Sequence, residues 1–176
     1  EVYRWSHISC EDGATVAAEQ DRMHQKMCDL LPRLHALVIG PGLGRDDRVL
    51  EAVKNVILSC RQAHLPLVID ADGLWLIERQ PQILKGYENA VLTPNAAELR
   101  RLSRALLGDE SADPQRVCDE LGGPILLQKG KVDYIYARGH APIQCAEQGT
   151  PRRPGGLGDF LAGSLGTFMG WAHMAD

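Results

Sequence analysis

Four short apolar runs, each ended by a glycine-rich or polar turn, constrain the fold of this chain more than any other feature. They cover residues 36–39, 67–69, 90–92 and 124–127. Continuous apolar runs of this length are typical of strands that are buried on both faces, as parallel strands are. Because helical patterns separate the runs, we predict an α/β protein with three αβα layers and a mostly parallel central sheet.

The segments between the runs support this alternation. Residues 14–31 predict a surface helix, and Asp46 and Asp47 suit the start of another helix. Asp113 and Pro114 open a further helix that stops at Gly122. Residues 132–136 and 143–145 predict a more exposed hairpin at an antiparallel edge of the sheet. The predicted core consists of Leu37, Val38, Ile39, Val68, Ile69, Val91, Leu92, Leu126 and Leu127.

Polar motifs follow all four runs. They are GPGLG at 40–44, DADG at 70–73, TPNAAE at 93–98 and QKG at 128–130. Parallel sheets bind ligands beyond the carboxyl ends of their strands, so we expect these motifs to share one edge. GPGLG lacks the full spacing of a dinucleotide fingerprint, which makes that interpretation weak.

The side chains in these motifs have two interpretations each. Asp70 and Asp72 can position Mg²⁺ directly or through water, while Asp72 can equally cap a helix. Asn95 and Glu98 either face a ligand or cap the helix that follows them.

The stretch Gly155-Gly156-Leu157-Gly158-Asp159 precedes an apolar run from residue 160 to 172. Its glycines let the backbone approach a ligand, and the first turn of a helix favours a phosphate. Asp159 would repel that phosphate, so it is better explained as a proton acceptor for a substrate hydroxyl. The alternative is a turn in which Asp159 only caps the helix.

Two further features accompany this stretch. Arg152 and Arg153, just before it, offer cations for phosphoryl transfer. Behind it, Gly163, Gly166 and Gly170 form a stripe that allows a helix to pack closely on a sheet.

Composition limits the class of protein. The 176 residues suit one domain, and a net charge of −4 argues against a general basic surface for nucleic acid. Five scattered cysteines without metal-ligand spacing indicate reduced thiols, as in the cytoplasm. No stretch has the length and apolarity of a membrane span or a signal peptide. The oligomeric state stays open, a homo-oligomer included.

Five motif regions together resemble the ATP-dependent NAD(P)H-hydrate dehydratase family of the ribokinase-like superfamily. They lie at residues 36–47, 67–77, 90–102, 126–133 and 149–166, spread over some two-thirds of the chain. The resemblance implies a lyase that uses ATP, with Mg²⁺, to dehydrate the (6S) hydrate of NADH or NADPH in the cytoplasm or in mitochondria. Because family members have further N-terminal and C-terminal segments, we expect residues 1–176 to be one incomplete ribokinase-like domain.

The resemblance also implies site residues. Asp159 would be the catalytic base and would contact the hydrate. The other implied substrate contacts are Gly44, Asn95, Ala96, Ala97, Glu98, Leu99, Arg100 and Arg101. The implied ATP contacts are Lys129, Gly130, Lys131, Val132, Asp133, Gly149, Thr150, Pro151, Arg152, Arg153, Pro154, Gly155, Gly156, Leu157 and Gly158.

Two alternatives remain beside this interpretation. Another ribokinase-like small-molecule kinase would share the glycine loop and Asp159. A truncated form without catalysis would bind nucleotide or act only through a partner.

Overall fold

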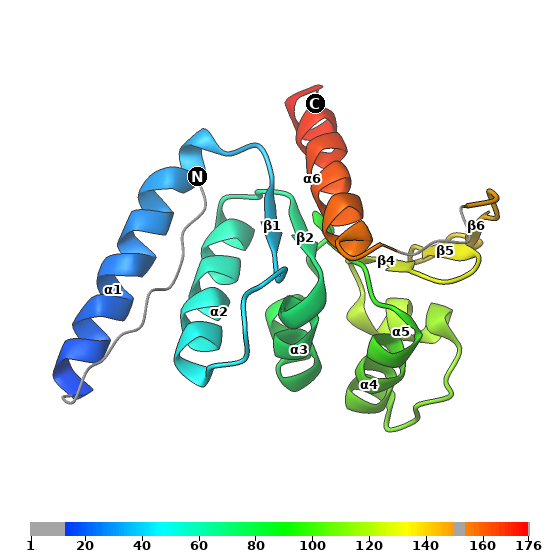
Figure 1. The fold of residues 1–176 in the computed structure, drawn as a ribbon, viewed down its shortest axis with the longest axis horizontal. Helices are drawn as coiled ribbons and strands as arrows, with labels where there is room; N and C mark the ends of the chain where they lie inside the picture. Colours follow the sequence, from blue (N-terminus) through cyan, green and yellow to red (C-terminus); the bar gives the residue numbers. More distant parts are fainter. Residues whose placement is uncertain (1–12, 150–153, 176) are drawn as a thin grey trace.

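A sheet of six strands, in the order β1 to β6, runs through the part of the molecule that the computed structural model describes, residues 13–149 and 154–175 (Figure 1). β1 to β4 are parallel, β5 is antiparallel to β4, and β6 is antiparallel to β5. The mostly parallel sheet with an antiparallel hairpin is therefore confirmed. The strands are β1 (Leu37–Ile39), β2 (Leu67–Ile69), β3 (Ala90–Leu92), β4 (Ile125–Gln128), β5 (Asp133–Tyr136) and β6 (Ile143–Cys145).

Helices on both faces of the sheet give the three predicted layers. α2 to α5 cover one face, α6 crosses the other over β1 and β2, and α1 packs against α2 at one end (Figure 1). Two short 3₁₀ helices, η1 (Leu31–Arg33) and η2 (Pro81–Ile83), complete the connections. The α-helices are α1 (Gly13–Leu30), α2 (Asp47–Gln62), α3 (Ala71–Arg79), α4 (Ala96–Leu107), α5 (Pro114–Leu121) and α6 (Leu157–Ala175).

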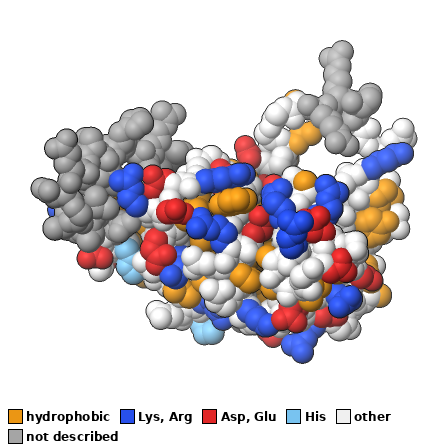
Figure 2. Space-filling view, turned by 90° about the horizontal axis from the view of Figure 1, so that it is seen from below, with side chains coloured by type: hydrophobic (Ala, Val, Ile, Leu, Met, Phe, Trp, Pro, Cys, Tyr) orange, Lys and Arg blue, Asp and Glu red, His pale blue; other side chains and the backbone are white. Residues whose placement is uncertain are grey.

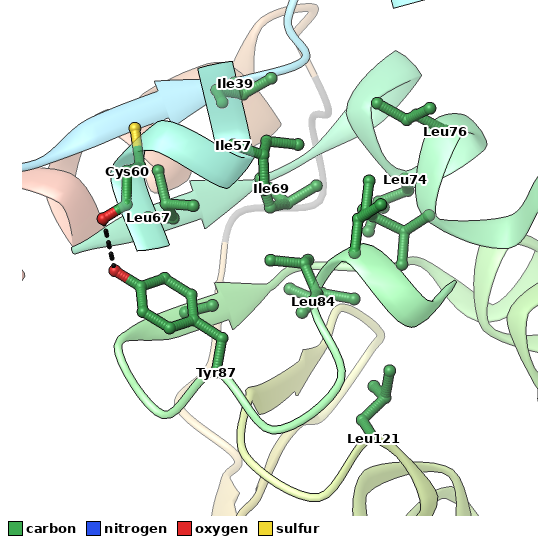
Figure 3. Close-up of a cluster of buried hydrophobic side chains, with 14 of the residues drawn as sticks. Ile39, Ile57, Cys60, Leu67, Ile69, Leu74, Leu76, Leu84, Tyr87 and Leu121 are labelled. Carbon is green, nitrogen blue, oxygen red and sulfur yellow. Dashed lines mark hydrogen bonds between the residues drawn. The ribbon is translucent and has the colours of Figure 1, made fainter. Parts of the chain in front are cut away.

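The main core lies between the sheet and the layer formed by α2 to α5 (Figure 3). Ile57 of α2, Ile69 of β2 and Leu121 of α5 are completely buried in it. The hydroxyl of Tyr87 closes one end by donating to the carbonyl oxygen of Leu65 at 2.6 Å. Burying a side chain of this size contributes about 1.5–3 kcal/mol, so this layer stabilises the sheet that carries the polar turns.

The strand β1 is less buried than its sequence predicts. Leu37 and Val38 are only half-buried, whereas the other seven predicted core residues are buried. Among the described residues β1 pairs with β2 alone, and a groove of about 350 Å³ lies between it and α6. An edge strand beside such a groove cannot bury both faces, so the prediction was wrong for these two side chains.

The glycines of α6 let the helix approach β1. A Cβ built at Gly166 would lie 2.7 Å from Cγ2 of Val38, and one at Gly170 would lie 3.4 Å from Cβ of His35. At Gly163 no described atom lies within 4 Å of the same position. The predicted close packing therefore holds for two of the three glycines.

The cysteines and the helices give two further observations. Cys28, Cys60, Cys118 and Cys145 are free thiols, and burial raises the pKa of Cys60 to about 12. In the described part of the chain, no helix is both long and apolar enough to cross a membrane.

Candidate functional site at the carboxyl edge of the sheet

In Figure 1, β1 and β2 run downward, so their carboxyl ends lie at the lower edge of the sheet. Because β3 and β4 are parallel to them, all four strands end on the same side, and a polar motif follows each. Figure 2 views the molecule from this side, with Lys and Arg side chains interspersed with Asp and Glu. Several are ion-paired, including Arg45 with Asp72 and Arg79 with Asp47. Part of the charge at this edge is therefore held in specific pairs.

A partly buried ion pair lies where β2, β4 and α6 meet. The Nζ of Lys129 donates to Oδ1 of Asp70 at 2.6 Å, and the Asp70 side chain is only 2% exposed. A Cβ built at Gly158 would lie 3.6 Å from that Nζ and 3.5 Å from Oδ2 of Asp70. A lysine ammonium is thus held against the N-terminus of α6, where the backbone amides and the helix dipole also favour an anion.

The loop before α6 has the backbone geometry that its glycines predict. Gly156 has a φ of 85°, in the region that favours glycine, and its carbonyl oxygen accepts from the amide of Phe160 at 3.0 Å. Asp159 lies in the first turn of α6 and is exposed, beside Gly158. A carboxylate is therefore exposed one residue after the glycine that approaches the lysine. The predicted residues Thr150 to Arg153 lie outside the described residues.

Asp72 binds the GPGLG loop, a contact that the sequence did not reveal. Its Oδ2 accepts from the amide of Gly44 at 3.1 Å, and its Oδ1 accepts from Nε of Arg45 at 3.0 Å. The Arg45 guanidinium also lies 4.7 Å from the centre of the Trp75 ring. Asp72 is in the first turn of α3, while the N-cap position is Asp70. Asp72 therefore does not cap α3, which was one of the two roles that the sequence left open.

Two glycines allow the turns after β1 and β2 to pack closely against each other. A Cβ at Gly40 would collide with the carbonyl oxygen of Asp70, and one at Gly73 would lie 2.8 Å from the carbonyl oxygen of Ile39. Between them Ala71 has a φ of 46°, a conformation that costs a non-glycine residue about 1–3 kcal/mol. The two turns thus form one rigid unit at the edge of the sheet.

The turn after β3 lies beside the lysine and caps α4. The Asn95 side chain accepts from the amides of Ala97 and Glu98, and the Glu98 carboxylate accepts from the amide of Asn95 at 2.8 Å. A parallel bridge joins Asn95 to Lys129. Asn95 and Glu98 are therefore a capping box, and their exposed edge adjoins the anion-favouring corner.

The predicted substrate residues on α4 have different environments. Ala96, Ala97 and Arg100 are exposed, whereas Leu99 is buried in the core with 6% of its surface exposed. Arg101 donates from Nε to the carboxylate of Glu78 at 3.0 Å. Burial raises the pKa of Glu78, and the hydrogen bond from Arg101 opposes this rise. Leu99 therefore acts by anchoring the helix, since its side chain is not available to a ligand.

The segment after β4 forms a tight turn. The amide of Gly130 donates to Oδ1 of Asp133 at 2.7 Å, and a Cβ at Gly130 would lie 2.8 Å from the carbonyl oxygen of Val132. Lys131 is exposed at the tip of this turn. Gly149 and the residues from Pro154 to Leu157, further along the chain, are also exposed. This geometry leaves Lys131 and the glycine amides open to a phosphate.

The carboxylates at this edge do not form a magnesium site of their own. Asp70 binds Lys129, and Asp72 binds Arg45 and the Gly44 amide. Among the described residues no three Asp, Glu, His or Cys side chains lie close enough to hold a metal ion. Because each carboxylate already has a cationic partner, the direct Mg²⁺ role that the sequence allowed for Asp70 and Asp72 does not fit.

An α/β sheet with a lysine and a glycine-rich helix start at its carboxyl edge defines a protein of the ribokinase-like class. In agreement, a ribokinase-like superfamily protein from Enterococcus faecalis aligns with a TM-score of 0.68 and 28% identity, over 82% of this chain and 50% of that chain. Hydroxyethylthiazole kinase from Pyrococcus horikoshii aligns with a TM-score of 0.67 and 19% identity, over 83% of this chain and 59% of that one, and shows the fold alone.

The chain belongs to the NAD(P)H-hydrate dehydratase family, whose sequence model matches residues 7–176. It is 49% identical over 151 residues to the ATP-dependent (S)-NAD(P)H-hydrate dehydratase of Bos taurus, covering 82% of this chain and 46% of that protein. The human enzyme of the same name is 46% identical, with 82% and 43% covered. The predicted family is therefore confirmed, and the chain spans about half the length of these curated relatives.

Proposed function

We propose that this chain carries the ATP-dependent dehydration of the (6S) hydrate of NADH or NADPH, which restores the working cofactor. The proposal rests on one arrangement above all: Lys129 is held by Asp70 against the N-terminus of α6, next to the exposed Asp159. The position of a cation and helix amides beside a free carboxylate suits phosphoryl transfer to a hydroxyl group. The activity named for the relatives supports the same reaction.

The reaction has two steps. In the first, the oxygen of the added hydroxyl group forms a bond to the γ-phosphorus of ATP, and ADP leaves. Asp159 accepts the proton of that hydroxyl group as the bond forms. In the second, phosphate departs with the electron pair of the carbon–oxygen bond, and loss of a proton from the neighbouring carbon restores the double bond of the ring. Phosphorylation is needed because hydroxide is a poor leaving group and phosphate is a good one.

The residues around Asp159 divide between the two substrates. The amides of Gly155 to Gly158, with Lys129 and Lys131, would hold the phosphates of ATP. The loop at Gly44 and the start of α4 at Asn95 would hold the hydrate. We propose that Mg²⁺ arrives with ATP, bound to phosphate oxygens and water, since Mg²⁺ keeps several waters in nucleotide sites.

The experiment is a spectroscopic assay of the purified 176-residue chain with the hydrate, ATP and Mg²⁺. We expect the absorbance of the reduced nicotinamide to rise with time and ADP to form in equal amount. Omitting ATP should abolish the rise. ADP formation without recovery of the nicotinamide absorbance would contradict a dehydratase and favour a kinase that only phosphorylates its substrate.

The corner of Lys129 and Gly158 suits a phosphate on its own, which favours one second candidate, a form that binds nucleotide without catalysis. Such a form would bind ATP at the corner of Lys129 and Gly158 and give no change in absorbance. The same assay, run beside a nucleotide titration, separates it from the dehydratase.

A further inference from the structure

We propose that Asp72 is a positioning residue that holds the substrate loop, residues 42–45, and so sets the affinity for the hydrate without affecting the nucleotide. This inference rests on the proposed function, because it takes Gly44 to be a contact of the hydrate. It assigns a role to a side chain that the reaction itself does not use.

Asp72 uses both carboxylate oxygens on two consecutive residues of the loop. Oδ2 accepts from the amide of Gly44 at 3.1 Å, and Oδ1 accepts from Nε of Arg45 at 3.0 Å. A hydrogen bond to a charged group contributes more than one between neutral groups. The Asp72 side chain is 25% exposed, so water only partly screens these bonds.

Besides Asp72, the Leu43 side chain holds the middle of the substrate loop by packing against the core. Gly42 and Gly44 have φ values of 68° and 77°, and no described atom lies within 4 Å of a Cβ built at either. At the start of the loop, the amide of Leu43 donates to the carbonyl oxygen of Gly40 at 3.1 Å. Because two flexible glycines flank Leu43, the end of the loop at Gly44 depends on Asp72 for its position.

The Arg45 side chain adds a second attachment to the same helix. Its guanidinium lies over the ring of Trp75, one turn after Asp72 on α3. Asp72 and Trp75 thus fix Arg45 from two directions, and Arg45 in turn fixes the residue next to Gly44. An ordered loop loses less conformational freedom when a ligand binds, which increases its affinity.

The contacts of Asp72 are separate from those of the nucleotide corner. Asp70, on the other side of Ala71, binds Lys129, and Gly158 approaches Asp70 and Lys129. Asp72 is not the N-cap of α3, so its replacement leaves the start of the helix with its own cap position. A change at Asp72 should therefore act on one substrate only.

The test compares Asp72→Ala, Asp72→Asn and the control Asp47→Ala. Asp47 is at the same edge and is exposed, and its ion pair is with Arg79, outside the substrate loop. Two measurements are made on the 176-residue chain: the hydrogen-exchange rate of the Gly44 amide without ligand, and the dissociation constants of the hydrate and of ATP by calorimetry.

We expect Asp72→Ala to speed exchange of the Gly44 amide and to weaken hydrate binding about tenfold or more. Asp72→Asn keeps an acceptor for Gly44 but loses the ion pair with Arg45, so its effect should be intermediate. ATP binding should stay within about twofold of wild type in both. Asp47→Ala should change neither measurement.

Three results would overturn the inference. Unchanged exchange at Gly44 in Asp72→Ala would show that other contacts hold the loop. Faster exchange with unchanged hydrate affinity would show that loop order does not matter for binding. An equal loss of hydrate and ATP affinity would indicate a general structural role. A wild-type chain that binds no hydrate would instead refute the proposed function, and this inference with it.

Discussion

Asp159 is the residue on which the proposed chemistry depends, and its two interpretations predict opposite results for one substitution. In Asp159→Asn the side chain keeps its size but cannot accept the hydroxyl proton. General-base catalysis contributes about 10² to 10⁴ in rate, so we expect the turnover to fall by at least that range while ATP binding is retained. The rate of nicotinamide recovery and an ATP titration measure the two effects.

The matched control is Asp113→Asn, at the N-cap of α5, where the carboxylate accepts from the amide of Gln115. Asn and Asp are comparable caps, so this variant should keep both activity and stability. Near-normal turnover in Asp159→Asn would leave Asp159 as an acidic residue in the first turn of α6, which begins at Leu157, and would remove it as the base.

Gly40 and Gly42 belong to one motif but should respond differently to Ala. At Gly40 a Cβ would collide with the backbone of Asp70, and its φ of 129° is almost restricted to glycine. We expect Gly40→Ala to lose several kcal/mol of stability or to prevent folding. At Gly42 the φ is 68° and the described surroundings are open, so the cost should be about 1–2 kcal/mol.

Chemical denaturation of the two variants checks this difference. Equal losses of stability in the two variants would mean that the close approach of the turns after β1 and β2 does not contribute to stability.

Single residues also show where prediction from sequence stops. The edge that gathers Gly44, Asn95 and Lys129 follows from the rule that parallel strands end together. The partner of each carboxylate does not follow from it. Asp70 pairs with Lys129, 59 positions away, and Asp72 reaches Gly44, 28 positions back along the chain. Such pairs depend on the twist of the sheet and on the left-handed turn at Ala71, which no local pattern encodes.

At the scale of elements, the glycines of α6 offer a direct test of how the helix packs on β1. In Gly166→Ala the new methyl group would meet Cγ2 of Val38, so we expect a loss of about 1–3 kcal/mol. In Gly163→Ala no described atom is near, and the higher helix propensity should stabilise the protein by about 0.5–1 kcal/mol.

A double substitution identifies the contact. Combining Gly166→Ala with Val38→Ala removes the collision. We therefore expect the double variant to lose less free energy of unfolding than the sum of the two single losses. Thermal or denaturant unfolding of the three variants gives the coupling free energy. Strict additivity would show that α6 does not approach β1 at this point.

Two substitutions of Asn95, the N-cap of α4, distinguish a capping role from a ligand-binding role. Asn95→Ala removes the acceptor for the amides of Ala97 and Glu98 and should cost about 0.5–2 kcal/mol. Asn95→Asp keeps the cap and should leave stability nearly unchanged. If Asn95 also contacts the hydrate, the charge of Asn95→Asp should alter the hydrate KM at normal stability. Normal KM in this variant would leave Asn95 with the cap alone.

At the scale of the whole molecule, the periodicity of the sequence predicted the strands of the sheet well but predicted the burial of the edge strand β1 poorly. Apolar runs bounded by turns located β1 to β4 because burial on both faces requires such runs. They did not reveal that Leu37 and Val38 would be half-buried, since burial of an edge strand depends on what lies beside it. Local composition predicts that a segment forms a strand. How much of that strand is buried depends on the helices and strands that pack against it.

The last prediction asks whether the whole chain binds nucleotide as a folded unit. A ligand that binds only the native state stabilises it by RT ln(1 + [L]/Kd), or about 2.7 kcal/mol at a concentration of 100 Kd. In a domain of this size, 1 kcal/mol shifts the midpoint by about 2–4 °C, so saturating ATP should raise the Tm by roughly 5–10 °C. A calorimetric melt with and without ATP and Mg²⁺ measures the shift.

Gly156→Val is the control for where the nucleotide lies. Gly156 has a φ of 85° in an exposed loop, so a β-branched residue should distort the loop and leave the layered core intact. The variant should melt close to wild type without ATP and lose most of the shift with it. A full shift in Gly156→Val would place the phosphates away from the glycine loop, and would therefore also separate Asp159 from the γ-phosphate that the proposed reaction requires beside it.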